Sequence, residues 1–213
     1  MATIEEAQNV GYYILCTLDD ICKEKNLKFV LNFGTCLGAV RHNGFIPWDD
    51  DIDLMMTYKQ VKKLKKYFKK HDNNVNGISY SDFEFDHETP YCFSKLRYNA
   101  SCTPALKFGN LNLNRGIGLD IFEYCYCAKN PKLKEFQDYL YGLTLTLHEK
   151  YMTRDLINRG IFSTDLYNNN IICRLSEKAP DCFRVLAIKL AKNLMCLVGS
   201  KKSGKYLTMS DYI

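Results

Sequence analysis

Apolar and polar positions near the start of the chain follow the spacing of an amphipathic helix. Ile14, Leu18 and Ile21 recur every three or four residues, which places them on one side of a helix. Residues 3–6 (TIEE) give a threonine followed three residues later by a glutamate, the pattern of a capping box. The pattern therefore predicts a first helix that begins at this box and ends near Lys25.

Shorter apolar runs in the middle of the chain predict strands. Residues 51–56 alternate, with Asp51 and Asp53 on one face and Ile52 and Leu54 on the other. Further strands are expected at residues 27–33, 78–85, 91–98 and 118–127. Gly34 ends the first of these runs, and a short helix is expected over residues 35–40.

After residue 130 the apolar spacing becomes helical. The strongest patterns predict helices over residues 133–152 and 181–198, and a weaker pattern indicates one over 166–177. Strands in the middle followed by helices at the end indicate an α+β fold. We therefore expect a core over residues 1–130 and a helical region over residues 131–213.

A lysine-rich segment runs from Lys62 to Lys70. Val61, Leu64 and Phe68 share one helix face, and lysines occupy most of the remainder. The segment is expected to form an amphipathic surface helix with a solvated basic face. The alternative interpretation is a patch that favours an anionic surface, such as a peripheral membrane contact.

The composition, with 46% hydrophobic and 25% charged residues, is typical of a globular domain. The N-terminus has no basic stretch followed by an apolar run, and the chain has no apolar stretch of about 18 residues, so we expect neither a signal peptide nor a membrane span. The ten cysteines form no C-x-x-C pair, which favours reduced thiols in a cytoplasmic protein. Despite a net charge of +5, the chain has no base-reading motif, so we expect no nucleic-acid partner.

An acidic run is the main chemical feature of the sequence. Within residues 49–53, Asp49, Asp51 and Asp53 would project from one face of a strand, about 7 Å apart per step. At an effective dielectric constant of 20, the repulsion between two such neighbours is on the order of 2 kcal/mol. A divalent cation would turn this repulsion into coordination, and oxygen-only ligands favour Mg²⁺ or Mn²⁺.

Two other interpretations of the acidic run are weaker. A calcium loop needs glycine at its sixth position and glutamate at its twelfth, where this chain has Leu54 and Gln60. The alternation of apolar residues also indicates a strand. A solvated acidic turn, without any ligand, is the second alternative.

Several residues near the acidic run are candidates for contacts with phosphate. Gly34 and Thr35 lie between a predicted strand and a predicted helix, where backbone N–H groups bind anions. Arg41 lies between this turn and the aspartates. Lys95 and Arg97 alternate on one strand face and could neutralise a diphosphate, although paired surface charges are the alternative.

Residues 33–53 read FGTCLGAVRHNGFIPWDDDID, which closely resembles the signature of the LicD family of phosphorylcholine transferases and fukutin-related proteins. Residues 118–122 (GLDIF) resemble a later segment of the same family. The resemblance implies a nucleotidyltransferase fold of the DNA polymerase beta type, with a mixed sheet and flanking helices. Family members usually continue into a further C-terminal segment, so region 131–213 is expected to be truncated relative to them.

The resemblance also implies a reaction and a set of site residues. A phospho-alcohol, such as phosphocholine, would pass from a CDP-linked donor to a sugar hydroxyl of a cell-surface glycan such as lipopolysaccharide or teichoic acid, with release of CMP. The metal ligands would be Asp49, Asp51, Asp53 and Asp120. Catalysis would rest on the last three of these, and Asp120 could also accept the acceptor's proton. Donor contacts would come from Gly34, Thr35, Arg41, Lys95 and Arg97.

Two rival functions remain open at this point. A nucleotidylyltransferase of the same fold would attack a different phosphorus and release pyrophosphate instead of CMP. A shortened family member could also serve as a non-catalytic binding subunit. In each case the expected location is the cytoplasm, with peripheral contact at the inner face of the membrane.

Overall fold

The computed structural model describes residues 3–86, 89, 91–102, 114–158 and 180–209. These residues fall into two compact units. The first holds the described residues of 1–81, 93–104 and 114–124, and the second holds those of 82–92 and 125–213. The division into domains at residue 130 stays a prediction.

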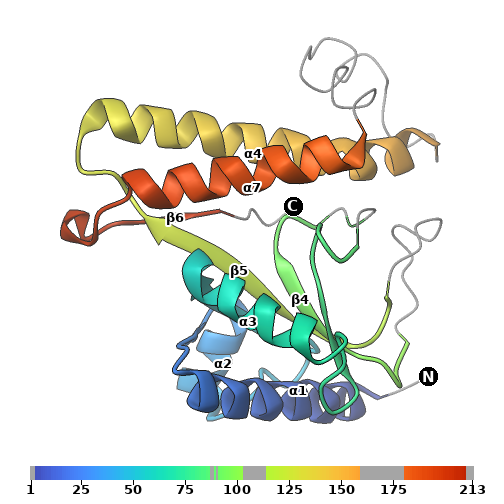
Figure 1. The fold of residues 1–213 in the computed structure, drawn as a ribbon. Coiled ribbons are helices and arrows are strands. Elements are labelled where there is room, and N and C mark those ends of the chain that lie inside the picture. Colours follow the sequence, from blue (N-terminus) through green and yellow to red (C-terminus); the bar gives the residue numbers. More distant parts are fainter. Residues whose placement is uncertain (1–2, 87–88, 90, 103–113, 159–179, 210–213) are drawn as a thin grey trace. The chain divides into compact units, whose positions relative to one another are not determined.

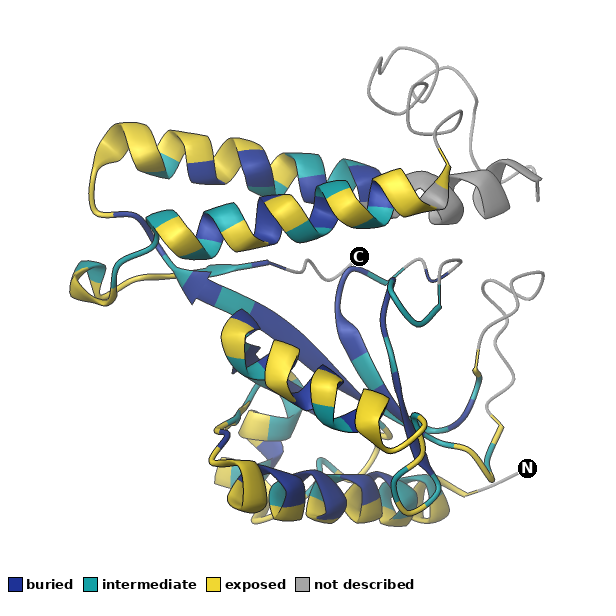
Figure 2. Cartoon of the chain, in the orientation of Figure 1, coloured by how far each residue is buried: buried dark blue, intermediate teal, exposed yellow. Residues whose placement is uncertain are grey.

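Helix α1 (Ile4–Lys25) opens the first unit, as the sequence predicts. Its capping box is formed, because Thr3 N donates to Glu6 Oε2 (2.7 Å) and Glu6 N donates to Thr3 Oγ1 (3.1 Å). Asn26 ends the helix in the left-handed conformation, with φ 50°. Figure 2 shows the buried residues gathered along one side of α1, and Ile14 and Leu18 are among them.

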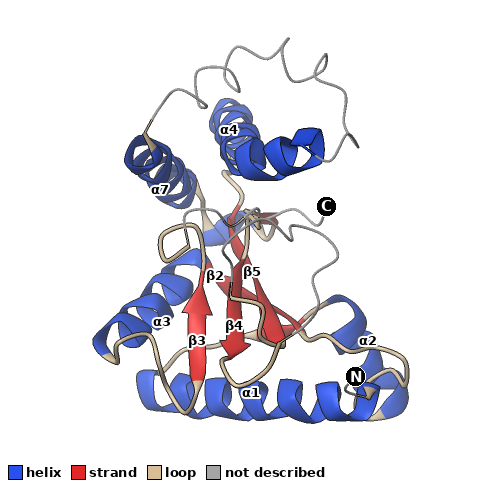
Figure 3. Cartoon of the chain, turned by 90° about the vertical axis from the view of Figure 1, so that its right-hand side faces the viewer, coloured by secondary structure: helices blue, strands red, loops and turns tan. Residues whose placement is uncertain are grey.

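A mixed sheet forms the centre of the first unit (Figure 3). Its strands are β1 (Val30–Leu31), β2 (Asp53–Thr57), β3 (Ile78–Ser81), β4 (Ser94–Tyr98) and β5 (Gly118–Tyr126), in the order β1-β2-β5-β4-β3. Strands β2 and β5 are parallel, whereas β1–β2, β3–β4 and β4–β5 are antiparallel. The predicted α+β class is confirmed, while the nucleotidyltransferase fold stays a prediction.

Helices α1 and α3 (Tyr58–Lys70) pack on the sheet through its apolar face. The ring of Phe68 lies 5.9 Å from that of Tyr80, and the ring of Tyr13 lies 5.7 Å from that of Tyr98. The core of this face also contains Leu54, Met56, Leu96, Leu119 and Ile121. Since side chains alternate along a strand, Asp53 and Asp120 project to the opposite face.

One polar chain crosses the apolar face. Tyr80 OH lies 2.6 Å from Ser94 Oγ, which donates to Glu123 Oε1 at 2.9 Å. All three residues are buried. Because Ser94 gives its only hydrogen to Glu123, the tyrosine hydroxyl is the donor to Ser94. The carboxylate of Glu123 is thereby satisfied within the core.

The second unit is built on helices α4 (Pro131–Asn158) and α7 (Asp181–Val198), which lie side by side in Figure 1. A short 3-10 helix, η1 (Lys201–Ser203), and strand β6 (Tyr206–Thr208) follow, and β6 pairs with β5. Phe83, Leu147 and Ile188 form a buried cluster in this unit. Lys189 Nζ donates to Glu84 Oε2 at 3.0 Å, which ties the segment after β3 to α7.

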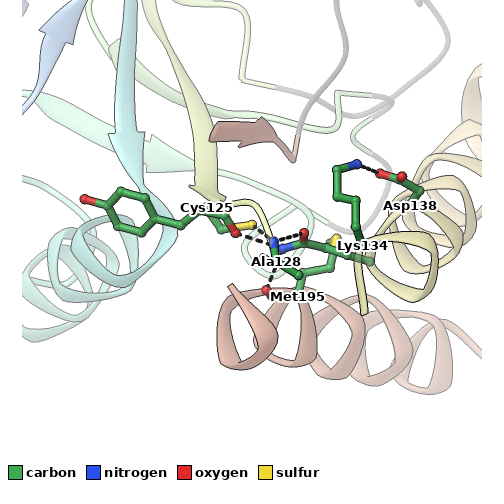
Figure 4. Close-up of polar contacts among 7 residues, drawn as sticks. Cys125, Ala128, Lys134, Asp138 and Met195 are labelled. Carbon is green, nitrogen blue, oxygen red and sulfur yellow. Dashed lines mark hydrogen bonds and ion pairs between the residues drawn. The ribbon is translucent and has the colours of Figure 1, made fainter. Parts of the chain in front are cut away.

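Gln137 of α4 joins three backbone segments of the second unit. Ala128 N donates to its Oε1 (2.9 Å), and its Nε2 donates to Met195 O (2.9 Å) and Tyr126 O (2.9 Å). The same nitrogen lies 3.5 Å from Cys125 Sγ, and Figure 4 shows the contacts that meet between Cys125, Ala128 and Met195. A fully buried amide with these partners fixes the end of β5 against both helices.

The structure corrects several predicted boundaries. The expected strand over residues 27–33 is formed only at Val30–Leu31, and the strand expected from Asp51 begins at Asp53. The strand expected over residues 78–85 ends at Ser81, because Asp82 Oδ1 accepts from Glu84 N (2.8 Å) and starts a turn. The helix expected over residues 166–177 lies outside the described residues.

The predicted helix boundaries agree more closely with the structure than the strand boundaries do. Helix α7 begins and ends at the expected residues, and α4 extends the expected 133–152 at both ends. Helix α3 buries Val61, Leu64 and Phe68, as their spacing predicts. None of the helices in the described ranges combines the length and apolar composition needed to cross a bilayer.

Candidate metal and phosphate site

Three charged residues stand in one row across the polar face of the sheet. Asp53 of β2 is the register partner of Asp120 of β5, and Asp120 is the register partner of Lys95 of β4. Neighbouring strands are about 4.8 Å apart, so register partners have adjacent side chains on the same face. The parallel pairing of β2 with β5 thus brings the acidic run beside a carboxylate from much later in the chain.

Lys95 forms an ion pair with Asp120 inside this row. Its Nζ lies 2.5 Å from Oδ1 and 2.8 Å from Oδ2, so one ammonium contacts both carboxylate oxygens. The two side chains are only 15% and 12% exposed. Burial lowers the pKa of Lys95, while the neighbouring Asp120 acts in the opposite direction. The pair is a partly desolvated contact of the kind that depends strongly on both partners.

The remaining carboxylates lie at the start of β2. Asp49 and Asp51 are partly buried in the segment before the strand, whereas Asp50 is exposed, so the alternation expected of a strand continues in their burial. Burial, followed by the nearby charges of Asp49 and Asp120, raises the pKa of Asp51 to about 6. Burial, followed by Asp51 and Asp120, raises the pKa of Asp53 to about 7. The four candidate ligands therefore share one electrostatic environment.

Asp53 contains a buried oxygen without a partner. Its Oδ1 is buried and has no hydrogen-bond partner among the described residues. A buried carboxylate oxygen in this state is costly, and a bound cation would relieve the cost. Within the part of the chain that the structure describes, no three His, Cys, Asp or Glu side chains are arranged as a metal site. Asp120 contacts Lys95 in this structure.

Helix α2 (Phe33–His42) holds the first residue of β2 from one side. Asn32 N donates to Asp53 O (2.9 Å), and Asp53 N donates to Thr35 Oγ1 (2.8 Å). A side chain on Gly34 would meet Asp49 Oδ2 at 2.6 Å from its Cβ. Gly34 and Thr35 were predicted from the sequence to contact donor phosphate. In the structure, these two residues also position the carboxylate residues Asp53 and Asp49.

Arg97 lies on the same face as Lys95 and makes a hydrogen bond to the backbone. Its Nη1 donates to Gly116 O at 2.9 Å, and the residue is buried. Arg41 is exposed in the last turn of α2 and does not join the row. Of the three cations predicted to bind the donor, the structure brings Lys95 directly onto a candidate metal ligand.

An aromatic cluster beside the row was missed by the sequence reasoning. The ring of Phe122 lies 4.7 Å from that of Phe93 and 5.2 Å from that of Phe33. Lys95 Nζ lies 4.9 Å from the centre of the Phe93 ring, within reach of a cation–π contact. The alternation of β5 already placed Phe122 on the face of Asp120, and this signal could have found it.

Phe33 also has an unusual backbone conformation at the start of α2. Its φ of 40° lies in the left-handed region, which bulky residues rarely adopt. Such a conformation costs on the order of 1–3 kcal/mol and tends to occur at functional sites. Here it coincides with the turn that delivers Gly34 and Thr35 to the acidic run.

Comparison with protein families places these residues in a known context. Residues 26–111 match the LicD/FKTN/FKRP nucleotidyltransferase domain. Over this segment the chain is similar to the LicD family. The matched segment includes α2, the acidic run, Lys95 and Arg97, while Asp120 lies beyond it. The resemblance predicted from the sequence is confirmed.

Individual relatives match over shorter stretches of the chain and cover only about a quarter or less of their own length. The lipopolysaccharide cholinephosphotransferase LicD of Haemophilus influenzae is 46% identical over 62 residues, which are 29% of this chain and 23% of that protein. An uncharacterised protein of Rickettsia prowazekii is 30% identical over 69 residues, which are 32% of this chain and 26% of that protein. An uncharacterised protein of Rickettsia typhi is 42% identical over 43 residues, which are 20% of this chain and 14% of that protein. No solved structure matches the chain.

Proposed function

We propose that this chain transfers a phospho-alcohol group, such as phosphocholine, from a CDP-linked donor to a sugar hydroxyl of a glycan. The row of Asp53, Asp120 and Lys95 on one face of the sheet supports the proposal most directly. The chain is similar to the LicD family over residues 26–111, and one relative is named a lipopolysaccharide cholinephosphotransferase. That relative motivates choline as the alcohol and a lipopolysaccharide-type glycan as the acceptor.

The chemistry of the site fits a divalent cation. The candidate ligands are carboxylates only, which favours Mg²⁺ or Mn²⁺. Burial, followed by the neighbouring carboxylates, raises the pKa of Asp51 and Asp53, and Oδ1 of Asp53 has no partner among the described residues. A bound cation would favour the ionised form of these carboxylates. The residues that would hold the ion are Asp49, Asp51, Asp53 and Asp120. When bound, such an ion would neutralise charge on the donor and on the leaving phosphate.

The proposed reaction makes one bond to phosphorus and breaks another. The acceptor hydroxyl oxygen bonds to the phosphorus that carries the alcohol. The bond from that phosphorus to the bridging oxygen breaks, and CMP leaves with the electron pair. Asp120 would accept the hydroxyl proton when it lies within hydrogen-bond reach of the acceptor. Lys95 would contact the donor's diphosphate, since its ammonium already contacts one of the candidate ligands, Asp120.

Helix α3 supports a peripheral location at the inner face of a membrane. Its exposed side includes Lys62, Lys63, Lys66, Lys69 and Lys70, while its apolar side packs on the sheet. Basic clusters of this size attract anionic lipid surfaces by about 1 kcal/mol per residue. Replacing Lys63 and Lys66 by glutamate should reduce co-sedimentation with anionic vesicles that contain about 30% phosphatidylserine. Neutral phosphatidylcholine vesicles serve as the control.

The decisive experiment measures CMP release by the full chain. We expect release from CDP-choline or CDP-ribitol in the presence of Mg²⁺ and a glycan acceptor, and none in EDTA. The Asp53→Asn variant should bind donor poorly and release no CMP. Turnover of a nucleoside triphosphate with pyrophosphate release would instead identify a nucleotidylyltransferase. Donor binding without any turnover would identify a non-catalytic binding subunit.

A further inference from the structure

The ion pair between Lys95 and Asp120 occupies both oxygens of a candidate metal ligand. One ammonium lies 2.5 Å from Oδ1 and 2.8 Å from Oδ2 of the same carboxylate. Asp120 is thereby neutralised by a side chain of the protein. Beside it in the row, Asp53 Oδ1 has no partner among the described residues. One of two adjacent carboxylates thus has a built-in counter-ion, and the other shows no such partner.

Burial makes the exchange of this counter-ion costly. The side chains of Lys95 and Asp120 are 15% and 12% exposed, so an ammonium that lost its carboxylate there would be a largely desolvated charge. Removing one partner from a buried pair is strongly unfavourable because the other charge is left uncompensated. A second cation can therefore take over Asp120 readily only when Lys95 gains another anion.

The donor supplies such an anion under the proposed function, on which this inference rests. A diphosphate bound next to the row would accept the ammonium of Lys95 in place of Asp120. We propose that Lys95 is a positioning residue that couples the two ligands: it holds Asp120 in the free protein and releases it to a divalent cation when a diphosphate is present. The cation and the diphosphate then bind with positive cooperativity, each raising the affinity for the other by the same factor.

Arg97 makes a different hydrogen bond. Its Nη1 donates to the backbone oxygen of Gly116 at 2.9 Å, a neutral acceptor outside the row. Removing its charge would change the general electrostatics of the same face without freeing Asp120. Arg97 is therefore a control that separates a specific exchange from a diffuse effect of positive charge.

The first arm of the test measures Mn²⁺ binding to the full chain without any phosphate compound, through the electron paramagnetic resonance signal of free Mn²⁺. Lys95→Met should bind Mn²⁺ at least about fivefold more tightly than the wild type, because Asp120 loses its competing cation. Lys95→Arg keeps the charge and should retain the weak wild-type affinity. Arg97→Gln should tighten binding much less than Lys95→Met. Should Lys95→Met fail to fold, as judged by circular dichroism, Lys95→Gln provides the same comparison.

The second arm measures CDP binding by calorimetry with and without a large excess of Mg²⁺. The complex of CDP with Mg²⁺ in solution is common to all variants, so differences between variants report on the protein. Mg²⁺ should increase the affinity for CDP at least about fivefold in the wild type, and most of this gain should vanish in Lys95→Met.

The outcomes distinguish this inference from the proposed function. If Lys95→Met binds Mn²⁺ no more tightly than the wild type, or if Arg97→Gln has the same effect, the exchange is overturned. In that case Mg²⁺-dependent CMP release by the wild type would leave the transferase function intact. If no variant binds Mn²⁺, both the exchange and the metal site of the proposed function are wrong.

Discussion

Asp53 and Asp120 are register partners on the parallel strands β2 and β5. Their carboxylates project from the same face, and after burial the charge of Asp120 contributes to the raised pKa of both Asp53 and its neighbour Asp51. Lys95 offsets the charge of Asp120 but lies one strand further from Asp53. Asp120 therefore has a counter-ion beside it, whereas Oδ1 of Asp53 has no partner among the described residues.

Replacement of Asp53 by asparagine should separate folding from function. At pH 8 in EDTA, the variant should melt at the same temperature as the wild type or higher, because repulsion with Asp51 and Asp120 is relieved. A relief of about 1 kcal/mol corresponds to roughly 2–4 °C for a chain of this size. The increase in melting temperature caused by Mg²⁺ should disappear. Asp50→Asn, which alters the exposed member of the run, is the matched control and should change neither quantity much.

Differential scanning fluorimetry provides both measurements. A fall of many degrees in Asp53→Asn without metal would mean that the acidic run stabilises the fold by itself, and the interpretation as a cation site would have to be abandoned.

The stability of the metal-free protein should decrease as the pH rises from about 4 to about 7. Asp53 has its pKa raised from 3.8 to about 7 in the folded state, and Asp51 from 3.8 to about 6. Between these values the folded state binds more protons than the unfolded state, so the free energy of unfolding falls with rising pH. The contribution is complete below the unfolded pKa and is lost as the pH passes through the folded value.

Urea unfolding in EDTA at several pH values tests this sign. The slope over pH 4–7 should be smaller in Asp53→Asn than in the wild type, and saturating Mg²⁺ should stabilise the wild type more at pH 8 than at pH 5. A wild-type stability that rises over the whole of this range in EDTA would contradict the expectation.

Two glycines of α2 should respond differently to replacement by alanine. In Gly34→Ala the new Cβ would lie 2.6 Å from Asp49 Oδ2, the end of a flexible side chain that can move away. In Gly38→Ala it would lie 2.5 Å from the backbone oxygen of Gly44, which cannot move without shifting the loop. We therefore expect Gly34→Ala to keep its melting temperature within a few degrees while Mn²⁺ binding weakens.

Gly38→Ala should instead lower the melting temperature clearly, although alanine favours a helix over glycine by about 1 kcal/mol. Thermal melting and Mn²⁺ titration of both variants supply the comparison. Equal losses of metal affinity at matched stability would argue against a specific role for Gly34 beside Asp49.

The hydroxyl of Thr35 should matter for the start of β2. Thr35→Val keeps the shape of the side chain but removes the acceptor for Asp53 N, whose hydrogen bond is 2.8 Å long. Leaving a buried donor unsatisfied costs about 1–3 kcal/mol of unfolding free energy. Thr35→Ser keeps the hydroxyl and should lose less. Urea titrations of the three proteins measure the difference, and a valine variant as stable as the wild type would show that this hydrogen bond is not important.

Local signals in the sequence were sufficient for the helices. The capping box of α1 and the apolar spacing of α3 and α7 involve only residues close in the chain, and the structure confirms these elements. Strand boundaries were less accurate because a strand ends where its neighbour stops pairing. Asp51 alternates like a strand residue, yet the pairing of β2 with β5 starts at Asp53.

The strand faces on which the candidate residues lie could be predicted from the sequence, but the pairing of these residues could not. Alternation alone places Lys95 and Arg97 on one face, and their register with Gly118 and Asp120 agrees with this. That Lys95 would contact Asp120 depends on the order of strands, which no local pattern specifies. The left-handed backbone conformation of Phe33 could likewise not be predicted, because no sequence pattern indicates that conformation for a phenylalanine.

The order of strands has a consequence for the moment at which the site can form during synthesis. β5 is the last of the five strands in the path β1-β2-β5-β4-β3, yet it lies in the middle and is the neighbour of both β2 and β4. Until the ribosome has released residues up to Tyr126, these two strands have no partner between them and present open edges, which invite aggregation. Asp53 and Lys95 are synthesised before Asp120, so they can lie beside it only after β5 has been synthesised. The acidic run therefore lacks its neighbouring carboxylate Asp120 until β5, the last of these five strands, has been synthesised.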